Sequence, residues 1–401
     1  MIKALRGMKD TISPMSQKYN YFIENATNIA KKYGFEFIET PILEETSLFK
    51  RSVGESSDIV GKEMYQFTDK GGNDVCLRPE GTAGVVRSFV EHKFDKVQGQ
   101  KYRFFYYGPM FRYERPQKGR LRQFHQFGVE SFGEASVYED ISIIQMAKEI
   151  LDFFGINYTL KLNSLGCKEC MPSYRDDLKS KLSSIEGLCE DCQRRRDTNP
   201  IRVFDCKNQN CQELIKDLPR IKDSLCDGCK SDFQTLTSML DALDISYEID
   251  SNLVRGLDYY NKTAFEFVST DLGAQNAVAG GGRYDRLVEF LDGKSTPAIG
   301  FAIGIERLLD MIEAPQNKRE GYYFGAMDEE AISELYIQAT HFRKEQKVNI
   351  SYEKKSLKAH LKGADKANAR YCVIIGEDEL KDKKLWIKDL ELKEEKKINF
   401  N

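Results

Sequence analysis

The sequence predicts an α+β fold with a large mixed body over residues 1–320, a mainly helical insertion over residues 166–235 and a small α/β unit over residues 321–401. The 401 residues are enough for two or three domains. Strands of alternating polarity lie between helical stretches along most of the chain. Eight of the ten cysteines are confined to residues 167–229, where the composition shifts towards Lys, Asp and Ser. These observations distinguish the body, the insertion and the C-terminal unit.

The composition limits the classes of protein to which the chain can belong. The 60 basic and 63 acidic residues give a formal net charge of −3, which excludes a polycation or an acidic disordered tail as the whole protein. A local basic face for nucleic acid remains compatible with this balance. No segment approaches the roughly 18 uninterrupted apolar residues of a membrane span. Residues 1–10 lack the apolar core of a signal peptide, so we expect a cytoplasmic protein with no membrane partner.

The first helix is predicted over residues 16–33, where apolar residues recur at helical spacing before Gly34. Residues 35–43 alternate like a strand, but Pro41 restricts it to a sheet edge or a bulge. In the C-terminal unit, strands are predicted at residues 322–324, 348–350, 371–375 and 385–387, with helical stretches between them.

Residues 101–133 carry the strongest β signal and predict an antiparallel hairpin around the turn-like residues 116–119. Successive side chains of a strand point to opposite faces, so residues of one parity share a face. On the first strand that face holds Gly108, Met110, Arg112 and Glu114. On the second strand it holds Arg122, Phe124, Gln126, Gly128 and Glu130. The opposite faces are mostly apolar, so the polar face is expected to carry the function.

Three arginines lie in apolar or glycine-containing segments: Arg112, Arg255 and Arg307. A guanidinium in such surroundings is costly unless it meets a carboxylate or a phosphate. A structural ion pair would explain any one of them, whereas three together favour an anion site such as one for a nucleotide triphosphate. We also expect residues 279–285 to form a glycine loop that opens a helix. Gly300 and Gly304 are expected one helical turn apart, on a helix packed against a sheet.

Six segments carry a family pattern: the surroundings of Pro41 and residues 78–82, 106–130, 253–260, 279–285 and 297–309. In them the chain resembles the class II histidyl-tRNA synthetases, and the resemblance runs from residue 6 nearly to the end. Motifs 1, 2 and 3 of the class correspond to Pro41, 106–130 and 297–309. Residues 253–260 and 279–285 match the histidine-specific signatures, and residues 78–82 match the amino-acid-binding loop. The implied architecture is a class II antiparallel-sheet catalytic domain with the cysteine-rich insertion, followed by an anticodon-binding domain.

The resemblance implies activation of L-histidine with ATP and transfer of histidine to the 3′ end of tRNA(His). The implied ATP-binding residues are Arg112, Glu114, Arg120, Phe124 and Arg307. Among them, Arg112 would contact the α-phosphate, Arg120 and Arg307 the outer phosphates, Glu114 the adenine amino group and Phe124 the adenine ring. Arg255 would lie between the histidine carboxylate and the α-phosphate, so Arg255 and Arg112 are the expected catalytic residues. Mg²⁺ is expected on the outer phosphates.

The histidine-binding residues that the resemblance implies are Glu80, Thr82, Gln126, Glu130, Arg255, Tyr260 and Tyr284. Glu130 and Tyr260 would read the imidazole, while Glu80, Thr82 and Gln126 would hold the amino group. A site that satisfies both ring nitrogens rejects analogues that lack one of them, so no editing domain is needed.

The cysteines of the insertion form four closely spaced pairs: Cys167 and Cys170, Cys189 and Cys192, Cys206 and Cys211, and Cys226 and Cys229. Two such pairs can complete a tetrahedral Cys₄ site for Zn²⁺, and eight cysteines suffice for two sites. The alternatives are small buried apolar residues or redox-active thiols. We expect structural zinc, and the spacing leaves the combination of pairs open.

A second function is weighed against the ligase: the non-catalytic, synthetase-like regulatory subunit of ATP phosphoribosyltransferase. That subunit lacks an anticodon-binding domain, whereas this chain continues past residue 320 into a Lys-rich unit and keeps the arginines named above. Motif 1 elements usually form a two-fold contact in class II enzymes, so a homodimer is expected.

Overall fold

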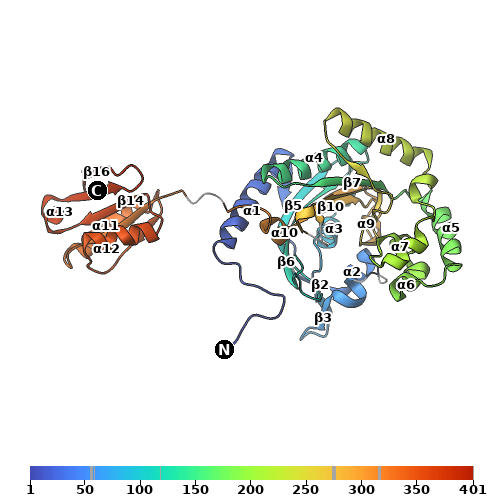
Figure 1. Cartoon of the computed structure of the whole chain (residues 1–401), viewed down its shortest axis with the longest axis horizontal. Helices are drawn as coiled ribbons and strands as arrows, with labels where there is room; N and C mark the ends of the chain where they lie inside the picture. Colours follow the sequence, from blue (N-terminus) through green and yellow to red (C-terminus); the bar gives the residue numbers. More distant parts are fainter. Residues whose placement is uncertain (55–56, 58, 118, 273–276, 315–317, 401) are drawn as a thin grey trace. The chain divides into compact units, whose positions relative to one another are not determined.

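The computed structural model describes residues 1–54, 57, 59–117, 119–272, 277–314 and 318–400. The chain divides into two compact units, Met1–Glu313 and Ala314–Asn401 (Figure 1). Lys118, within the predicted turn at 116–119, lies outside the described residues. No helix in the described ranges combines the length and the apolarity that crossing a membrane requires.

An eight-stranded sheet forms the centre of the first unit, in the order β1-β5-β6-β11-β10-β9-β7-β8. The strands are β1 (Glu36–Phe37), β5 (Tyr102–Phe111), β6 (Gln123–Phe132), β7 (Thr159–Ser164), β8 (Glu248–Ile249), β9 (Asn261–Val268), β10 (Ala277–Arg283) and β11 (Ala298–Gly304). The six central strands pair antiparallel, whereas the edge strands β1 and β8 run parallel to β5 and β7.

The two faces of this sheet bury different side chains. The helices α1 (Met15–Lys32), α4 (Val137–Phe153) and α8 (Asp227–Ala242) pack on one face, where Phe105, Phe127 and Val129 enter the shared core (Figure 1). The helices α2 (Thr46–Val53), α3 (Thr82–Glu91) and α9 (Leu287–Phe290) form a core with Tyr106 and Met110 on the other face. The alternation predicted for the hairpin is therefore confirmed.

Several predicted elements of the first unit are confirmed with small changes. The helix expected at 16–33 is α1, and the hairpin pairs Gly108 with Gln126 and Met110 with Phe124. The strand expected at 35–43 is divided around Pro41 into β1, at the edge of the large sheet, and β2 (Leu43–Glu45). β2 belongs to a separate three-stranded sheet with β4 (Asp74–Leu77) and β3 (Tyr65–Thr68).

Two glycine-rich segments differ from the prediction. Residues 279–283 are part of strand β10 and not of a loop that opens a helix, and Gly300 and Gly304 lie in strand β11, ahead of the short helix α10 (Ile305–Leu309). Glycine is needed here because side chains from other segments lie directly against the backbone of these strands. A Cβ on Gly280 would come within 2.5 Å of the Arg255 guanidinium, and one on Gly300 would collide with the Glu130 carboxylate. At these positions glycine therefore allows a side chain from another segment to approach the sheet backbone closely.

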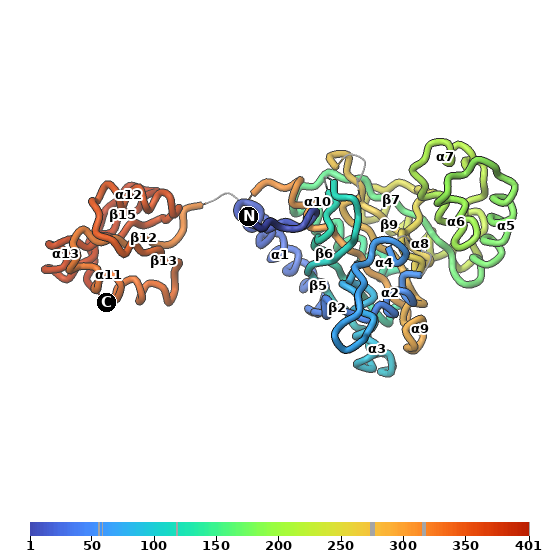
Figure 2. Tube along the Cα trace, turned by 90° about the horizontal axis from the view of Figure 1, so that it is seen from below, coloured from blue at the N-terminus to red at the C-terminus, as the bar shows by residue number. Residues whose placement is uncertain are grey.

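The cysteine-rich insertion follows β7. It comprises α5 (Met171–Ser183), α6 (Glu190–Thr198), the 3₁₀ segment η3 (Pro200–Asp205), α7 (Gln209–Ile215), a second 3₁₀ segment η4 (Ile221–Ser224) and the start of α8. Its helices α5, α6 and α7 lie together at one side of the sheet (Figure 2). Its buried side chains form a core of their own. Leu178, Leu182, Cys192 and Cys211 are each fully buried in this core. This core is a cluster distinct from the two that flank the sheet, and Ala264 of β9 also belongs to it.

The second unit is a five-stranded sheet in the order β13-β12-β14-β15-β16 with three helices. Its strands are β12 (Tyr322–Ala326), β13 (Val348–Ile350), β14 (Tyr371–Ile375), β15 (Lys384–Asp389) and β16 (Glu395–Asn399), and its helices are α11 (Ala331–Phe342), α12 (Leu357–Lys366) and α13 (Glu377–Asp382). The four strands predicted here are confirmed. β16 was missed because it is a charged, largely exposed edge strand that lacks an apolar run.

Candidate active site

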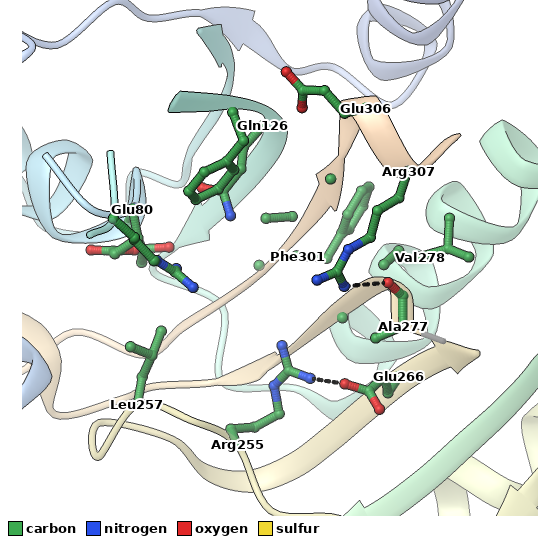
Figure 3. Close-up of a pocket in the computed structure, with 18 of the residues that line it drawn as sticks. Glu80, Gln126, Arg255, Leu257, Glu266, Ala277, Val278, Phe301, Glu306 and Arg307 are labelled. Atoms are coloured by element: carbon green, nitrogen blue, oxygen red, sulfur yellow. Dashed lines mark hydrogen bonds and ion pairs between the residues drawn. The ribbon is translucent and has the colours of Figure 1, made fainter. Parts of the chain in front are cut away.

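A pocket opens on the polar face of the large sheet, and β6, β10, β11 and the segment 253–260 contribute to its wall (Figure 3). The residues predicted from the sequence that line it are Glu80, Thr82, Arg112, Glu114, Arg120, Phe124, Gln126, Arg255, Tyr260 and Arg307. Figure 3 shows Arg255 and Arg307 extending into the pocket opposite Glu80. Glu130 and Tyr284 do not line the open space but are buried beside it.

Arginines crowd one part of this pocket. Arg307 projects from α10 and donates to the carbonyl oxygens of Gly119, at 3.0 Å, and Ala277, at 2.8 Å. Burial, followed by the charges of Arg120 and Arg112, lowers the pKa of Arg307. Mutual repulsion between cations is relieved by a polyanion, so this part of the pocket is suited to phosphates.

The motif 2 residues meet around one aromatic ring. The guanidinium of Arg112 lies 5.2 Å from the centre of the Phe124 ring, and its Nε donates to the Pro79 carbonyl oxygen at 2.9 Å. Glu114 pairs with Arg120 at 2.8 Å. A purine stacked on Phe124 would lie between an arginine and a carboxylate, which is a suitable environment for an adenine ring with its phosphates.

Arg255 reaches the pocket from the segment 253–260, which has no helix or strand. Its Nη1 pairs with Glu266 of β9 at 2.9 Å, and its guanidinium lies 5.4 Å from the Tyr260 ring. Although burial opposes the charge, Tyr260 and Glu266 raise the pKa of Arg255. The bare backbone of Gly280 leaves the space that this guanidinium fills. The pocket therefore holds a partly buried cation, positioned by Glu266, opposite Glu80 (Figure 3).

Glu130 accepts hydrogen bonds from three hydroxyl groups beside the pocket. Thr82 donates to Oε1 at 2.7 Å, Tyr106 donates to Oε1 at 3.2 Å and Tyr284 donates to Oε2. Burial, followed by the charge of Glu80, raises the pKa of Glu130 to about 8 against these hydrogen bonds. A buried carboxyl of this kind is a specific partner for a nitrogen heterocycle.

Glu80 and Gln126 provide further acceptors. The carboxylate of Glu80 accepts from the backbone N–H groups of Thr82 and Ala83, both at 2.8 Å, where α3 begins. Burial raises the pKa of Glu80. The Oε1 atom of Gln126 is buried and has no hydrogen-bond partner among the described residues. A ligand ammonium group could satisfy both side chains.

Three functional positions were missed by the sequence analysis. Tyr106 shares the polar face of β5 with Gly108, so parity alone could have identified it. Glu266 lies on β9 and Tyr259 lies next to Tyr260, and both line the pocket. The partner of Glu266 is Arg255, which the fold supplies from a different segment, and no local pattern signals that pair.

The eight cysteines of the insertion gather into two groups of four. The outer group comprises Cys167, Cys170, Cys226 and Cys229, and the inner group comprises Cys189, Cys192, Cys206 and Cys211. Within each group the sulfur atoms all lie within 4.8 Å of one another. Sulfur–sulfur distances of 3.7 to 3.9 Å are too long for a disulfide. They match the roughly 3.8 Å expected for four thiolates at about 2.3 Å from one tetrahedral Zn²⁺.

Backbone N–H groups also point at these sulfurs. Cys170 Sγ accepts from the Cys167 N–H at 3.0 Å in the outer group, and Cys211 Sγ accepts from the Cys189 N–H at 3.2 Å in the inner group. Such donors stabilise thiolates, which are the form that binds a metal. The donor chemistry of both groups therefore fits zinc.

Comparison with known proteins gives a consistent result along the whole chain. Residues 7–308 match the family model described as histidyl-tRNA synthetase, and residues 324–401 match the model described as anticodon binding domain. The histidine–tRNA ligase of a Nitratiruptor species is 64% identical over 399 residues, which cover 100% of this chain and 98% of the relative. That of Campylobacter fetus subsp. fetus is 59% identical over 403 residues, covering 100% of this chain and 98% of the relative.

Solved structures agree with these relatives. Apo histidyl-tRNA synthetase of S. aureus is 35% identical, with a TM-score of 0.83, covering 100% of this chain and 97% of that one. A protein of Bacillus halodurans C described as an ATP phosphoribosyltransferase regulatory subunit/histidyl-tRNA synthetase is 19% identical, with a TM-score of 0.66. The comparison covers 94% of this chain and 98% of that protein, and it shows a shared fold alone. The chain belongs to the histidyl-tRNA synthetase family.

Proposed function

We propose that this protein activates L-histidine with ATP to form histidyl-adenylate and then transfers histidine to the 3′ end of tRNA(His). One observation carries the proposal: a single pocket combines crowded arginines with a buried carboxyl and further acceptors suited to an amino acid. The first part fits a nucleotide triphosphate, and the second fits histidine.

In the proposed activation step the histidine carboxylate attacks the α-phosphorus of ATP and pyrophosphate departs. Arg112 and Arg255 would neutralise the charge that builds up around the α-phosphate, and Arg120 and Arg307 would hold the outer phosphates. Arg120 is paired with Glu114, so it would have to leave this partner to reach a phosphate. Glu114 would then be available to read the adenine amino group above Phe124.

Mg²⁺ would supply further charge neutralisation at the outer phosphates when ATP is bound. Of the carboxylates that line the pocket, Glu266 is an oxygen ligand of the kind that Mg²⁺ accepts, and the phosphates would supply further oxygen ligands.

Histidine would be selected through its ring and its amino group. Glu130, supported by Tyr284, and Tyr260 would face the imidazole, whereas Glu80, Thr82 and Gln126 would hold the ammonium. The buried and unpaired Oε1 of Gln126 supports this assignment, because an unsatisfied buried acceptor is costly without a ligand.

For the second step we propose that residues 321–401 bind the anticodon. The match of residues 324–401 to an anticodon-binding model supports this role. The regulatory-subunit alternative is not supported, since three curated relatives that are 59 to 64% identical over 99 to 100% of this chain are histidine–tRNA ligases.

We further propose a cytoplasmic homodimer that uses the edge strand β1 and its surroundings. Phe37, Ile42 and Leu43 are 49%, 42% and 44% exposed there, although their side chains are apolar. A two-fold contact would bury them. A monomer at micromolar concentration in sedimentation equilibrium would contradict this proposal.

We also propose that each cysteine group binds one structural Zn²⁺. Four thiols at tetrahedral spacing, with backbone N–H donors to two sulfurs of each group, support this in both groups. The two ions would stabilise the insertion and take no part in the chemistry.

The first prediction concerns Arg255. Wild-type protein should catalyse histidine-dependent exchange of pyrophosphate into ATP, and Arg255→Ala should lower kcat by about 100-fold or more, because its charge is needed most in the transition state. The KM for ATP should change much less. Arg286→Ala, which removes an exposed arginine outside the pocket, serves as the control. Wild-type protein without exchange activity would refute the proposed function.

The second prediction concerns the pH dependence of stability. The pKa of Glu130 is near 4.3 in the unfolded chain and about 8 in the folded protein. Its favourable contribution is therefore fully present below about pH 4 and is lost as the pH rises through 8. Glu130→Gln removes this loss, so its free energy of unfolding relative to wild type should increase on the order of 4 kcal/mol between pH 5 and pH 9. Chemical denaturation at several pH values measures the difference.

The same variant should lose histidine-dependent exchange activity, because an amide cannot ionise to pair with the imidazole as the carboxyl would. A difference in unfolding free energy that stays constant with pH would show that Glu130 does not carry the raised pKa.

The third prediction concerns the metal. Purified protein should contain two Zn²⁺ per chain, and Cys170→Ser and Cys192→Ser should each lose one ion, since each removes a ligand from a different group. Cys76→Ser is the matched control, because Cys76 is a buried cysteine outside both groups. Elemental analysis measures the ions. Metal-free protein with all eight thiols freely titratable would exclude the zinc sites.

A further inference from the structure

The segment 253–260, which carries Arg255 and Tyr260, is held between two separate parts of the first unit. On one side, the Asp258 N–H donates to the Val53 carbonyl oxygen at the end of α2, at 3.3 Å. The Asp258 carboxylate also lies against Gly54, where a Cβ would come within 2.5 Å of Oδ2. On the other side, the segment meets the cysteine-rich insertion. Because it contains no helix or strand, its shape depends on such contacts.

Asn199 makes the main polar contact from the insertion. Its Nδ2 donates to Asp258 Oδ1 at 2.7 Å, which is a hydrogen bond to a carboxylate and hence among the stronger kinds. Asn199 is 6% exposed and lies at the junction of α6 and η3. Its own backbone is fixed, since its N–H donates to the Arg195 carbonyl oxygen at 2.8 Å and its carbonyl oxygen accepts from the Arg202 N–H at 3.1 Å.

Arg202 adds to the contact between the insertion and the segment 253–260. It is 7% exposed, and its Nη2 would lie 3.9 Å from a Cβ on Gly256. A small cavity between the insertion and the segment is lined by Asn199 and Arg202 on one side and by Val254, Arg255 and Asp258 on the other. Arg255 therefore has the adenylation pocket on one side and the insertion on the other.

The inner cysteine group brackets this part of the insertion. Cys189 and Cys192 lie at the start of α6, Cys206 directly follows η3 and Cys211 lies in α7. Asn199 and Arg202 lie on the stretch between Cys192 and Cys206. A metal bound to the four sulfurs would fix both ends of that stretch, and hence the position of the Asn199 amide.

We infer that the insertion positions the segment 253–260. Asn199 is the positioning residue, and the inner cysteine group fixes the part of the insertion that carries Asn199. Asn199 acts through Asp258 on Arg255 and Tyr260 and does not touch the pocket itself. That these two residues serve histidine activation rests on the proposed function, whereas the mechanical link does not.

The test compares Asn199→Ala with Thr198→Ala in histidine-dependent pyrophosphate exchange. Thr198 is the exposed neighbour at the end of α6, and its hydroxyl donates within that helix, to the Arg194 carbonyl oxygen. Asn199→Ala should lower kcat/KM for histidine about 10- to 100-fold, since a small displacement of reacting groups has effects of that size. The KM for ATP should stay within about twofold of wild type. Thr198→Ala should leave both parameters unchanged.

A second arm reverses the hydrogen bond. Asn199→Asp places two carboxylates together, Asp258→Asn places two amides together, and the double variant restores one amide and one carboxylate with the donor on the other side. Asp258→Asn keeps an acceptor for the Asn199 amide, so the loss is expected in Asn199→Asp. The double variant should recover more histidine-dependent activity than Asn199→Asp alone, which a general loss of stability would not produce. Equal losses in the histidine and ATP parameters, or no recovery in the double variant, would overturn the inference.

Hydrogen exchange tests the mechanical link without relying on activity. Backbone amides of residues 253–260 should exchange faster in Asn199→Ala and in Cys192→Ser than in wild type, and at the wild-type rate in Thr198→Ala. Unchanged exchange in Asn199→Ala would overturn the inference even if the enzyme is active. Wild-type protein without exchange of pyrophosphate would instead refute the proposed function, and the hydrogen-exchange result would still decide the link.

Discussion

The burial of the Glu130 carboxyl is the constraint around which the pocket is arranged. A carboxyl in this environment must be surrounded by donors, and the chain provides them from three separate places: Thr82 at the start of α3, Tyr106 on β5 and Tyr284 just after β10. Gly300 has no side chain because the same carboxyl occupies that space. The sheet, α3 and the residue that follows β10 thus meet at one buried carboxyl, whose ionised form is costly to bury.

The sequence predicted those parts of the fold that depend on local periodicity. The hairpin of β5 and β6 follows from strict alternation, and both of its faces are as expected. The glycine-rich segments at 279–285 and 300–304 were assigned wrongly, because glycine composition is shared by loops, helix contacts and crowded strands. Only the side chains that press on Gly280 and Gly300, which come from distant segments, decide between these possibilities.

In the site, too, local patterns could be predicted from the sequence, whereas contacts between remote segments could not. Family motifs and strand parity led to the arginines, Phe124 and Gln126, all of which line one pocket. Tyr106 could have been added from parity, whereas the pairing of Glu266 with Arg255 and of Asn199 with Asp258 depends on contacts between remote elements. Likewise, cysteine spacing defined four pairs but could not select their combination. That choice depends on how α5 to α8 bring the two ends of the insertion together.

The combination that the fold selects is nested: the inner cysteine group lies entirely within the stretch of chain that the outer group encloses. Ribosomal synthesis runs from the N-terminus, so all four inner thiols have been made by residue 211, before Cys226 and Cys229 exist. On the proposed zinc binding, the inner cysteine group would therefore be complete before the strands β8 to β16 are made. The outer cysteine group would be completed afterwards and would join the two ends of the insertion, so that the insertion would assemble in two stages.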